Sequence, residues 1–229
     1  MRFRNVVFVL ALLSATFLST AAPRWAVAQT ASPAPAQHRP TSTPYTGDLS
    51  IFETPGRDQR LHIDRVMDVL AITPGKNVAD IGAGSGWFTV RAASRVGEKG
   101  MVYAVDINPA AIQHIDERIQ QERLNNIKTI LSKPDNPELP PDTIDAVLLL
   151  KTYHEVADPI ALLRNLRPAL RPGARVGIID RDGNGVDHGV HKQIVLHEAS
   201  EAGYRLLEEH DDLVKPDKVD YFLVLTVRR

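Results

Sequence analysis

The sequence of 229 residues contains no cysteine. This absence excludes disulfides, thiolate nucleophiles, cysteine-ligated zinc and a lipid-modified N-terminal cysteine. A surplus of either charge is also missing, because 27 Lys and Arg face 28 Asp and Glu, for a formal net charge of -1. The chain has no dense basic run either, so nothing in it predicts binding to nucleic acid or to an anionic membrane surface.

The chain has 14 glycines and 16 prolines, too few for a low-complexity or collagen-like protein, while 43% of it is hydrophobic and 24% is charged. This composition is that of an ordinary globular protein, and the length suits one domain with a sizeable core. The sequence shows no internal repeat, and it indicates no oligomeric state.

The first residues have the pattern of an export signal. Arg2 and Arg4 form a basic start, Val6–Leu18 is apolar, and Ala26–Ala28 supplies the small residues that signal peptidase requires. We expect residues 1–28 to be a cleavable signal peptide, cut after Ala28, that directs the protein to the periplasm. The alternative is an uncleaved anchor in the inner membrane, although the apolar stretch is shorter than the ~20 residues that span a bilayer.

The next segment, residues 29–48, is rich in Pro, Ala, Ser and Thr. It has too few large apolar side chains to offset the entropy cost of ordering the chain. We therefore predict a disordered spacer over 29–48 and a folded domain over 49–229.

Within that domain, apolar patterns alternate between helical and extended periods. Apolar residues at Ile63, Val66, Met67 and Leu70 predict a helix over 62–72, and the almost wholly apolar run Ile144–Leu150 suits a strand covered on both faces. The remaining segments predict strands over 77–81, 101–106, 127–131, 175–180, 204–210 and 221–227, and helices over 87–96, 109–124, 159–170 and 188–202. This order predicts a doubly wound α/β sheet whose last two strands form an antiparallel pair.

A glycine-rich turn follows the first predicted strand. Gly82, Gly84 and Gly86 stand at alternate positions, where the missing Cβ lets the backbone turn sharply and approach a ligand. Asp106 ends the second predicted strand, where its carboxylate can accept both hydroxyls of a ribose. Since ligands of such sheets bind beyond the carboxyl ends of the strands, these residues predict a nucleoside site.

The spacing of the glycines and the charge beside them indicate which kind of nucleoside this turn binds. A dinucleotide fold uses G-x-G-x-x-G and an open helix N-terminus for a pyrophosphate, whereas the spacing here is G-x-G-x-G. Asp80 precedes the glycines, and its carboxylate repels phosphate but suits an ammonium group. S-adenosylmethionine (SAM) carries an ammonium and a sulfonium and no phosphate.

Residues 78–86 together with Asp106 resemble motif I of class I SAM-dependent methyltransferases. Leu139–Asp145 and Leu166–Gly173 resemble the segments that precede the fourth and fifth strands of that family, so the likeness runs from about Phe52 to the end of the chain. The resemblance implies a Rossmann-like, seven-stranded mixed sheet of order 3-2-1-4-5-7-6 with helices on both faces. It also implies SAM as the cofactor and a small molecule as the methyl acceptor.

The same resemblance implies a set of cofactor-binding residues. Among them, Ile107 would pack on the adenine face and Asp135 would bind the adenine amino group; the alternative for Asp135 is a solvated acid in a loop rich in Pro and Asn. The whole set is Asp80, Gly82, Ala83, Gly84, Gly86, Asp106, Ile107 and Asp135. The segment Arg57–Gln59 either closes over the cofactor or caps the first helix.

More narrowly, residues 152–155, 179–181 and 191–192 resemble a group of often exported methyltransferases for which no common acceptor is known. Asp182–Gly185 forms a glycine-bearing connection where members of the wider family insert acceptor-recognition elements. The acceptor and the atom that is methylated are therefore not indicated.

Catalytic groups are expected after the fourth strand, which faces the sulfonium. His154 is the natural general base, because histidine changes charge near neutral pH; a histidine that caps or edges the core is the alternative. Tyr153 either lines the methyl pocket or packs in the core. Asp180 and His191 are both expected to reach the same cleft, where a carboxylate would orient an imidazole.

No metal site is expected, because Asp180, His154 and His191 are separated by long loops without local ligand spacing. His188 and His197 are expected on a helix surface. Two other functions stay open: a non-catalytic protein that binds SAM or another nucleoside, and an NAD-linked oxidoreductase, against which the glycine spacing and Asp80 count.

Overall fold

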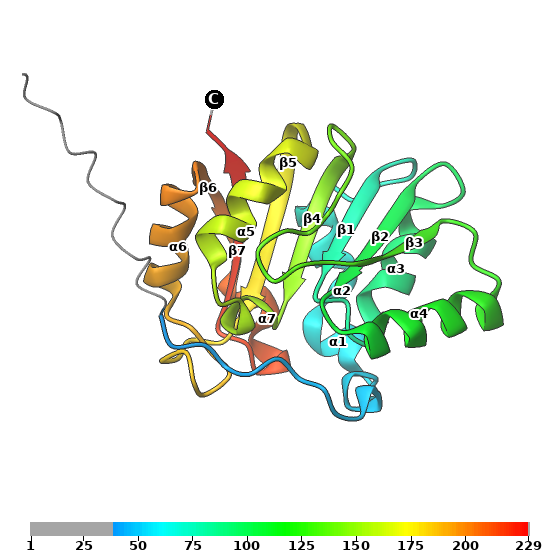
Figure 1. The fold of residues 1–229 in the computed structure, drawn as a ribbon, viewed down its shortest axis with the longest axis horizontal. Helices are drawn as coiled ribbons and strands as arrows, with labels where there is room; N and C mark the ends of the chain where they lie inside the picture. The colour runs from blue at the N-terminus through cyan, green and yellow to red at the C-terminus, as the bar shows by residue number, and fades with distance from the viewer. Residues whose placement is uncertain (1–38, 229) are drawn as a thin grey trace, which may run out of the picture. The chain divides into compact units, whose positions relative to one another are not determined.

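A computed structural model describes residues 39–228, in which a seven-stranded sheet lies between two layers of helices (Figure 1). Numbered along the chain, the strands lie in the order 3-2-1-4-5-7-6, which confirms the predicted fold class. The predicted signal peptide, 1–28, and the spacer as far as residue 38 lie outside the described residues. Export and cleavage stay predictions from the sequence.

Six strands keep, to within one residue, the bounds that their apolar runs predict, and the strand predicted over 175–180 begins five residues earlier, at Leu170. The strands are β1 Asn77–Ile81, β2 Met101–Asp106, β3 Ile127–Leu131, β4 Ile144–Leu150, β5 Leu170–Asp180, β6 Tyr204–Glu209 and β7 Tyr221–Val227. The pairs from β3 to β5 are parallel, and β7 runs antiparallel to both β5 and β6. The predicted antiparallel pair at the end of the chain is confirmed.

The five predicted helices are present, one with its predicted bounds, 87–96, and four with shorter ones, and two further short helices, 57–61 and 211–214, were not predicted. The helices are α1 Arg57–Leu61, α2 Ile63–Val69, α3 Trp87–Val96, α4 Pro109–Glu122, α5 Pro159–Leu166, α6 Lys192–Glu201 and α7 Asp211–Val214, with single 3-10 turns η1 Leu49–Phe52, η2 Tyr153–Glu155, η3 Arg167–Ala169 and η4 Lys215–Asp217. The helix predicted over 188–202 was wrong at its start, because His188 has a left-handed backbone (φ 57°) that no α-helix accommodates.

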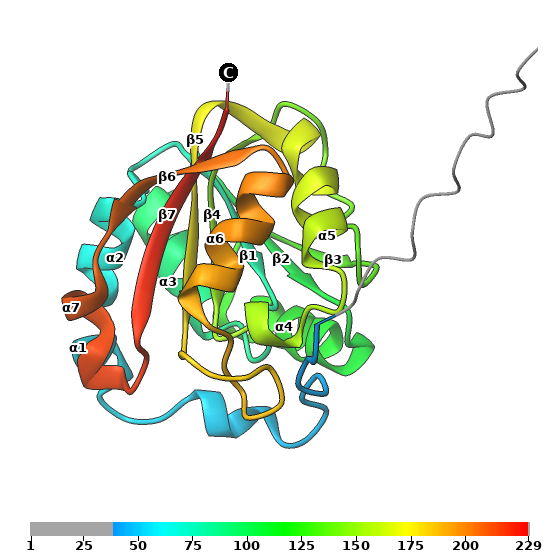
Figure 2. The same cartoon turned by 90° about the vertical axis from the view of Figure 1, so that its left-hand side faces the viewer.

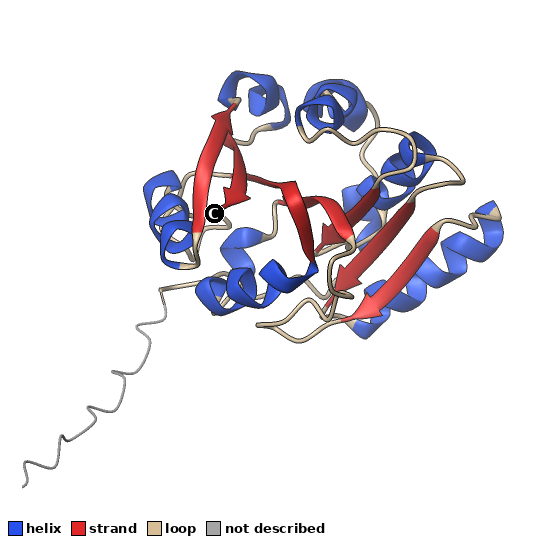
Figure 3. Cartoon of the chain, turned by 90° about the horizontal axis from the view of Figure 1, so that it is seen from above, coloured by secondary structure: helices blue, strands red, loops and turns tan. Residues whose placement is uncertain are grey.

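Helices cover both faces of the sheet (Figure 2), and each face has its own cluster of buried apolar side chains. Adjacent residues of β4 point to opposite faces, so that Val147 joins the layer with α5 and α6 while Leu148 joins the layer with α2, α3 and α4. Both side chains are fully buried, which explains why this strand reads as a continuous apolar run. Figure 3 shows the sheet twisting between the two helical layers.

The segment 39–56, here called the strap, corrects the predicted spacer over its last ten residues, 39–48. Arg39 pairs with Glu198 of α6 at 2.9 Å and donates to the carbonyl of Tyr153 at 2.8 Å. Ser42 is buried. The strap runs along the lower side of the molecule in Figure 1. The polar contacts of Arg39 and Ser42 hold it to the domain, although it has few large apolar side chains to bury. Among the described residues, no helix combines the length and the apolar character that crossing a membrane requires.

Candidate functional site

A cavity of about 770 Å³ opens at the carboxyl ends of β1, β2 and β4, where parallel strands of an α/β sheet present ligand sites. The glycine turn after β1 forms one wall, and the loop after β4 forms another. Thr41–Tyr45 and Phe52 of the strap line a third side. The volume is in the range of cavities that hold small molecules and cofactors.

The glycine turn has the conformation that its sequence predicts. Gly82 and Gly84 have φ angles of 75° and 54°, in the left-handed region that glycine tolerates best. A Cβ at Gly82 would lie 2.9 Å from Cβ of Thr152 and closer still to the tip of that side chain. One oxygen of Asp106 accepts the N–H of Gly84 and the other accepts the N–H of Asn108, both at 2.9 Å.

Asp80 places a buried carboxyl group at the base of the cavity. Its side chain is 2% exposed and accepts a hydrogen bond from Oγ1 of Thr89 at 2.6 Å. Burial raises the pKa of Asp80 to about 7, and the nearby charge of Asp106 acts in the same direction. A cation beside this carboxyl would favour its ionised form.

Arg57 lines the same cavity, and its charge acts on Asp80 to favour the ionised carboxylate. Its guanidinium stacks on Trp87 at 4.2 Å and donates to the carbonyl of Phe52 at 2.8 Å. It also faces Asp217 at 3.9 Å, and burial lowers its pKa. Of the segment Arg57–Gln59, Arg57 lines the cavity, whereas Asp58 pairs with Arg91 at 2.7 Å. All three residues belong to α1, whose N-cap is Gly56.

The structure places six of the eight predicted cofactor residues in the cavity wall. They are Asp80, Gly82, Ala83, Gly84, Asp106 and Ile107. Gly86 is instead buried at the cap of α3, where an added Cβ would lie 3.1 Å from Cγ1 of Ile115 in α4. Its role is therefore to let α4 approach the turn.

Asp135 does not reach the cavity, which corrects its predicted contact with adenine. Lys133 and Asn136 bond to each other's backbone in a tight turn, and this turn leaves Asp135 exposed. Its carbonyl accepts a hydrogen bond from Asn165 at 2.8 Å. Its neighbours Ser132, Lys133 and Pro134 line the cavity in its place.

In the wall formed by the loop after β4, His154 forms a buried pair with Asp180 at the end of β5. Nδ1 of His154 lies 2.7 Å from Oδ1 of Asp180, and the backbone N–H of His154 donates to Oδ2 at 3.0 Å. Asp180 is fully buried and also accepts the N–H of Arg181. With Nδ1 engaged, the free nitrogen of His154 is Nε2. Asp180 therefore orients the histidine and does not itself line the cavity.

Two other predicted catalytic residues lie away from the cavity. Tyr153 is fully buried and donates to Glu198 at 2.9 Å, so it packs beneath the wall and does not line a methyl pocket. His191 is exposed at the start of α6, where its Nδ1 contacts Asp182 at 3.1 Å. The expected pairing of His191 with Asp180 is wrong, because the histidine that Asp180 holds is His154.

Among the cavity residues to which the sequence analysis gave no role are Glu155 and His188. An oxygen of Glu155 lies 3.8 Å from Nε2 of His154, and burial raises the pKa of Glu155 to about 7. The ring of His188 stands edge-on to that of His154 with centroids 5.6 Å apart. Glu155 could have been predicted, because it adjoins His154 in the sequence. His188 could not, because it lies in an irregular loop without helical or strand periodicity. His197 is exposed on α6 as expected.

The family model, the curated relatives and the solved structure described below are all methyltransferases. A family model described as a methyltransferase domain matches residues 72–215, more than half of the chain. The chain is 26% identical over 110 residues to demethylmenaquinone methyltransferase of Geobacillus sp. (strain WCH70), a match covering 48% of this chain and 47% of that protein. It is 28% identical over 112 residues to aklanonic acid methyltransferase DauC of Streptomyces sp. (strain C5), covering 49% and 51%. The chain thus spans about half the length of these curated relatives.

Among solved structures, the fold matches that of a SAM dependent methyltransferase from Aquifex aeolicus. The TM-score is 0.70 at 23% identity, and the match covers 80% of this chain and 100% of that chain. At this identity the likeness shows the fold.

Proposed function

Because the chain belongs to the methyltransferase domain family, we propose that it transfers a methyl group from SAM to a small-molecule acceptor. The family match supports the predicted enzyme class and cofactor, since it includes the strands and the turn that form the cavity. The acceptor is a proposal. The relatives are named for acting on demethylmenaquinone and aklanonic acid, which makes these two compounds the first acceptors to test.

The observation that carries the proposal is the pair of carboxyl groups at the glycine turn. Asp80 and Asp106 end neighbouring strands and both line the cavity. Asp106 retains lone pairs for the ribose hydroxyls, because each of its oxygens accepts one backbone N–H. Asp80 suits an ammonium, and Arg57, in the same wall, suits the neighbouring carboxylate. These groups fit the methionine-derived part and the ribose of SAM.

The second requirement is alignment of the acceptor. SAM supplies a methyl group that its sulfonium already activates, so acceleration depends on holding the acceptor atom in line with it. We propose that the acceptor binds at the end of the cavity formed by His154, which Asp180 orients, and by the strap beside it. This end is called the acceptor end. In the transfer, the bond from the acceptor atom to the methyl carbon forms as the carbon–sulfur bond breaks. The bonding pair stays on sulfur, which becomes a neutral thioether, and the acceptor proton passes to water.

Calorimetry of the purified chain with SAM, S-adenosylhomocysteine (SAH) and NAD tests the cofactor. We expect saturable heat with SAM and SAH and none with NAD. Saturable NAD binding without heat from either sulfur nucleoside would overturn the proposal in favour of an oxidoreductase. Transfer of labelled methyl from SAM is then measured with demethylmenaquinone and aklanonic acid. Binding of SAM without transfer to these or to a wider panel of hydroxyl, thiol and carbon acceptors would favour the non-catalytic alternative.

The raised pKa of Asp80 makes a prediction for the pH dependence of cofactor binding. Below about pH 7 the carboxyl is protonated in the free protein and loses its attraction for the ammonium of SAH. The affinity should therefore rise with pH, by up to about tenfold per unit, and level off above the pKa. Thr89, Asp106 and Arg57 are the groups that face Asp80.

Calorimetric titration of SAH across this pH range checks the prediction, with Asp80→Asn as the matched control. The amide keeps the shape but cannot ionise, so its lower affinity should not change over the same range. An equal pH dependence in both proteins would assign the titration to another group.

A further inference from the structure

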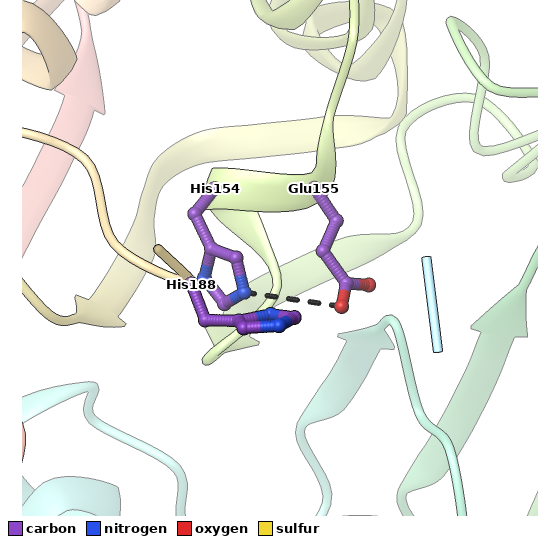
Figure 4. A group of neighbouring side chains, drawn as sticks. All are labelled: His154, Glu155 and His188. Atoms are coloured by element: carbon purple, nitrogen blue, oxygen red, sulfur yellow. Dashed lines mark ion pairs between the residues drawn. The ribbon is translucent and has the colours of Figure 1, made fainter. Parts of the chain in front are cut away.

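Three potential metal ligands converge at the acceptor end of the cavity, as Figure 4 shows. His154 and Glu155 come from η2, which follows β4, and His188 comes from the loop before α6. One ligand atom from each of the three lies within 4.8 Å of the other two. Two imidazoles and one carboxylate are a donor set that zinc accepts in sites with an open coordination position.

His154 is already fixed in the orientation of a ligand. It is 4% exposed, and its Nδ1 is held by Asp180 at 2.7 Å. Nε2 therefore faces Glu155, whose nearest oxygen is 3.8 Å away. A carboxylate behind the far nitrogen of a histidine is the usual outer partner of a metal-bound imidazole, because it fixes the tautomer and makes the ring more basic.

His188 is presented by a backbone conformation that is uncommon for its type. Its φ is 57°, which costs free energy for a residue with a Cβ and is often found at functional sites. The N–H of His188 donates to Oγ of Ser42 at 3.0 Å, and that hydroxyl reaches the carbonyl of Gly185 at 3.1 Å. The N–H of Ser42 donates to the carbonyl of His154. One buried strap residue thus joins the two segments that carry the histidines.

We propose that His154, Glu155 and His188 bind one zinc ion or a similar transition-metal dication. In a tetrahedral site with bonds of about 2.0–2.1 Å the ligand atoms stand about 3.4 Å apart. The separation of 3.8 Å between His154 and Glu155 is near this value, and the exposed side chain of His188 is free to rotate the remaining distance. The nitrogen ligands favour zinc, cobalt or iron over magnesium and calcium.

The site also suggests which acceptors the protein takes, a step that rests on the proposed methyl transfer. All three residues line the cavity that holds the glycine turn, so a coordination position not filled by the protein opens toward the methyl donor. A hydroxyl or thiol bound there loses its proton more readily, because the cation stabilises the anion. The acceptor class that fits is a small molecule with an ionisable oxygen or sulfur.

The test uses the full chain, freed of metal with a chelator and titrated with Co²⁺, whose absorption in the visible range reports the ligand geometry. We expect one equivalent to bind with the intense bands of a four- or five-coordinate site, and Zn²⁺ to displace it. Excess Mg²⁺ should not displace it, since Mg²⁺ prefers oxygen ligands. Featureless spectra without saturation would overturn the proposal.

Single variants locate the ion. His188→Ala and Glu155→Gln should each weaken Co²⁺ binding by at least about tenfold, because the loss of an outer partner alone costs 10–100-fold. The matched control is His197→Ala, which removes an exposed histidine of α6 whose side chain is 73% exposed, and it should bind as the parent does. Parent-like binding by His188→Ala would overturn the proposal. Since His188 is exposed in a loop, its loss should leave the melting temperature nearly unchanged.

SAH affinity, measured on the same proteins without metal, separates the two proposals. SAH binding without Co²⁺ binding would leave the proposed function standing and remove the metal site. Co²⁺ binding in a protein that binds no SAH would keep the metal site but remove its proposed role in methyl transfer.

Discussion

Replacing Gly82 with alanine should lower the affinity for SAH by at least about a hundredfold, close to 3 kcal/mol. Two effects add at this position. The left-handed backbone at φ 75° costs alanine about 1–2 kcal/mol. The new Cβ would also overlap the side chain of the adjacent Thr152, so the turn and the loop after β4 must move apart. Calorimetric titration with SAH measures the loss.

Gly173→Ala is the matched control for this substitution. Gly173 also has a left-handed backbone, at φ 84°, but a Cβ there meets no atom within 4 Å. It lies on β5, outside the cavity lining. Gly173→Ala should lower the melting temperature but leave the affinity for SAH within about twofold of that of the parent protein. If Gly82→Ala bound SAH as tightly as this control, the glycine turn would not be the cofactor site.

Asp180→Asn should lower the stability of the protein by about 2–4 kcal/mol, as expected when a buried hydrogen-bond network is broken. Asp180 accepts three hydrogen bonds, from the ring and the N–H of His154 and from the N–H of Arg181. An asparagine of the same shape must turn its NH₂ group toward one of these donors. At 2–4 °C per kcal/mol for a domain of this size, the melting temperature should fall by roughly 5–15 °C.

Asp182→Asn is the control, two residues further along. Asp182 contacts His191 and accepts the N–H of Lys192, but its side chain is 53% exposed, and water can replace either contact. Its melting temperature should change by less than about 2 °C. The two variants should also differ in Co²⁺ affinity, with a 10–100-fold loss only in Asp180→Asn. Equal behaviour of both would mean that Asp180 does not position His154.

The two adjacent residues Tyr153 and His154 show where local sequence stops being informative. Both follow β4, and either was a candidate for the cavity. The single turn of η2 sends the tyrosine toward Glu198 of α6 and the histidine toward Asp180 of β5. Their partners are 45 and 26 residues away, so no pattern within the segment distinguishes the two directions.

Asp135 and Gly86 make the same point for the cofactor end. Both occupy positions that the family resemblance marks, yet the turn of residues 133–136 carries Asp135 outward, and Gly86 packs against Ile115. The strap is the opposite case. Its composition predicts disorder, but Arg39 and Ser42 bind groups on α6, on η2 and in the loop before α6, which only the folded domain brings together.

The sequence by itself determined the order of the strands and of the longer helices and, at the cofactor end of the site, the glycine turn with Asp80 and Asp106. Apolar periodicity and glycine spacing are local properties, and parallel strands bring Asp80 and Asp106 to the same edge once β1 and β2 pair. Only the tertiary structure decided the acceptor end. His154, Glu155 and His188 meet because a buried aspartate and a strap serine hold segments that lie far apart in the chain. Such contacts arise from packing and have no local signature that a sequence can show.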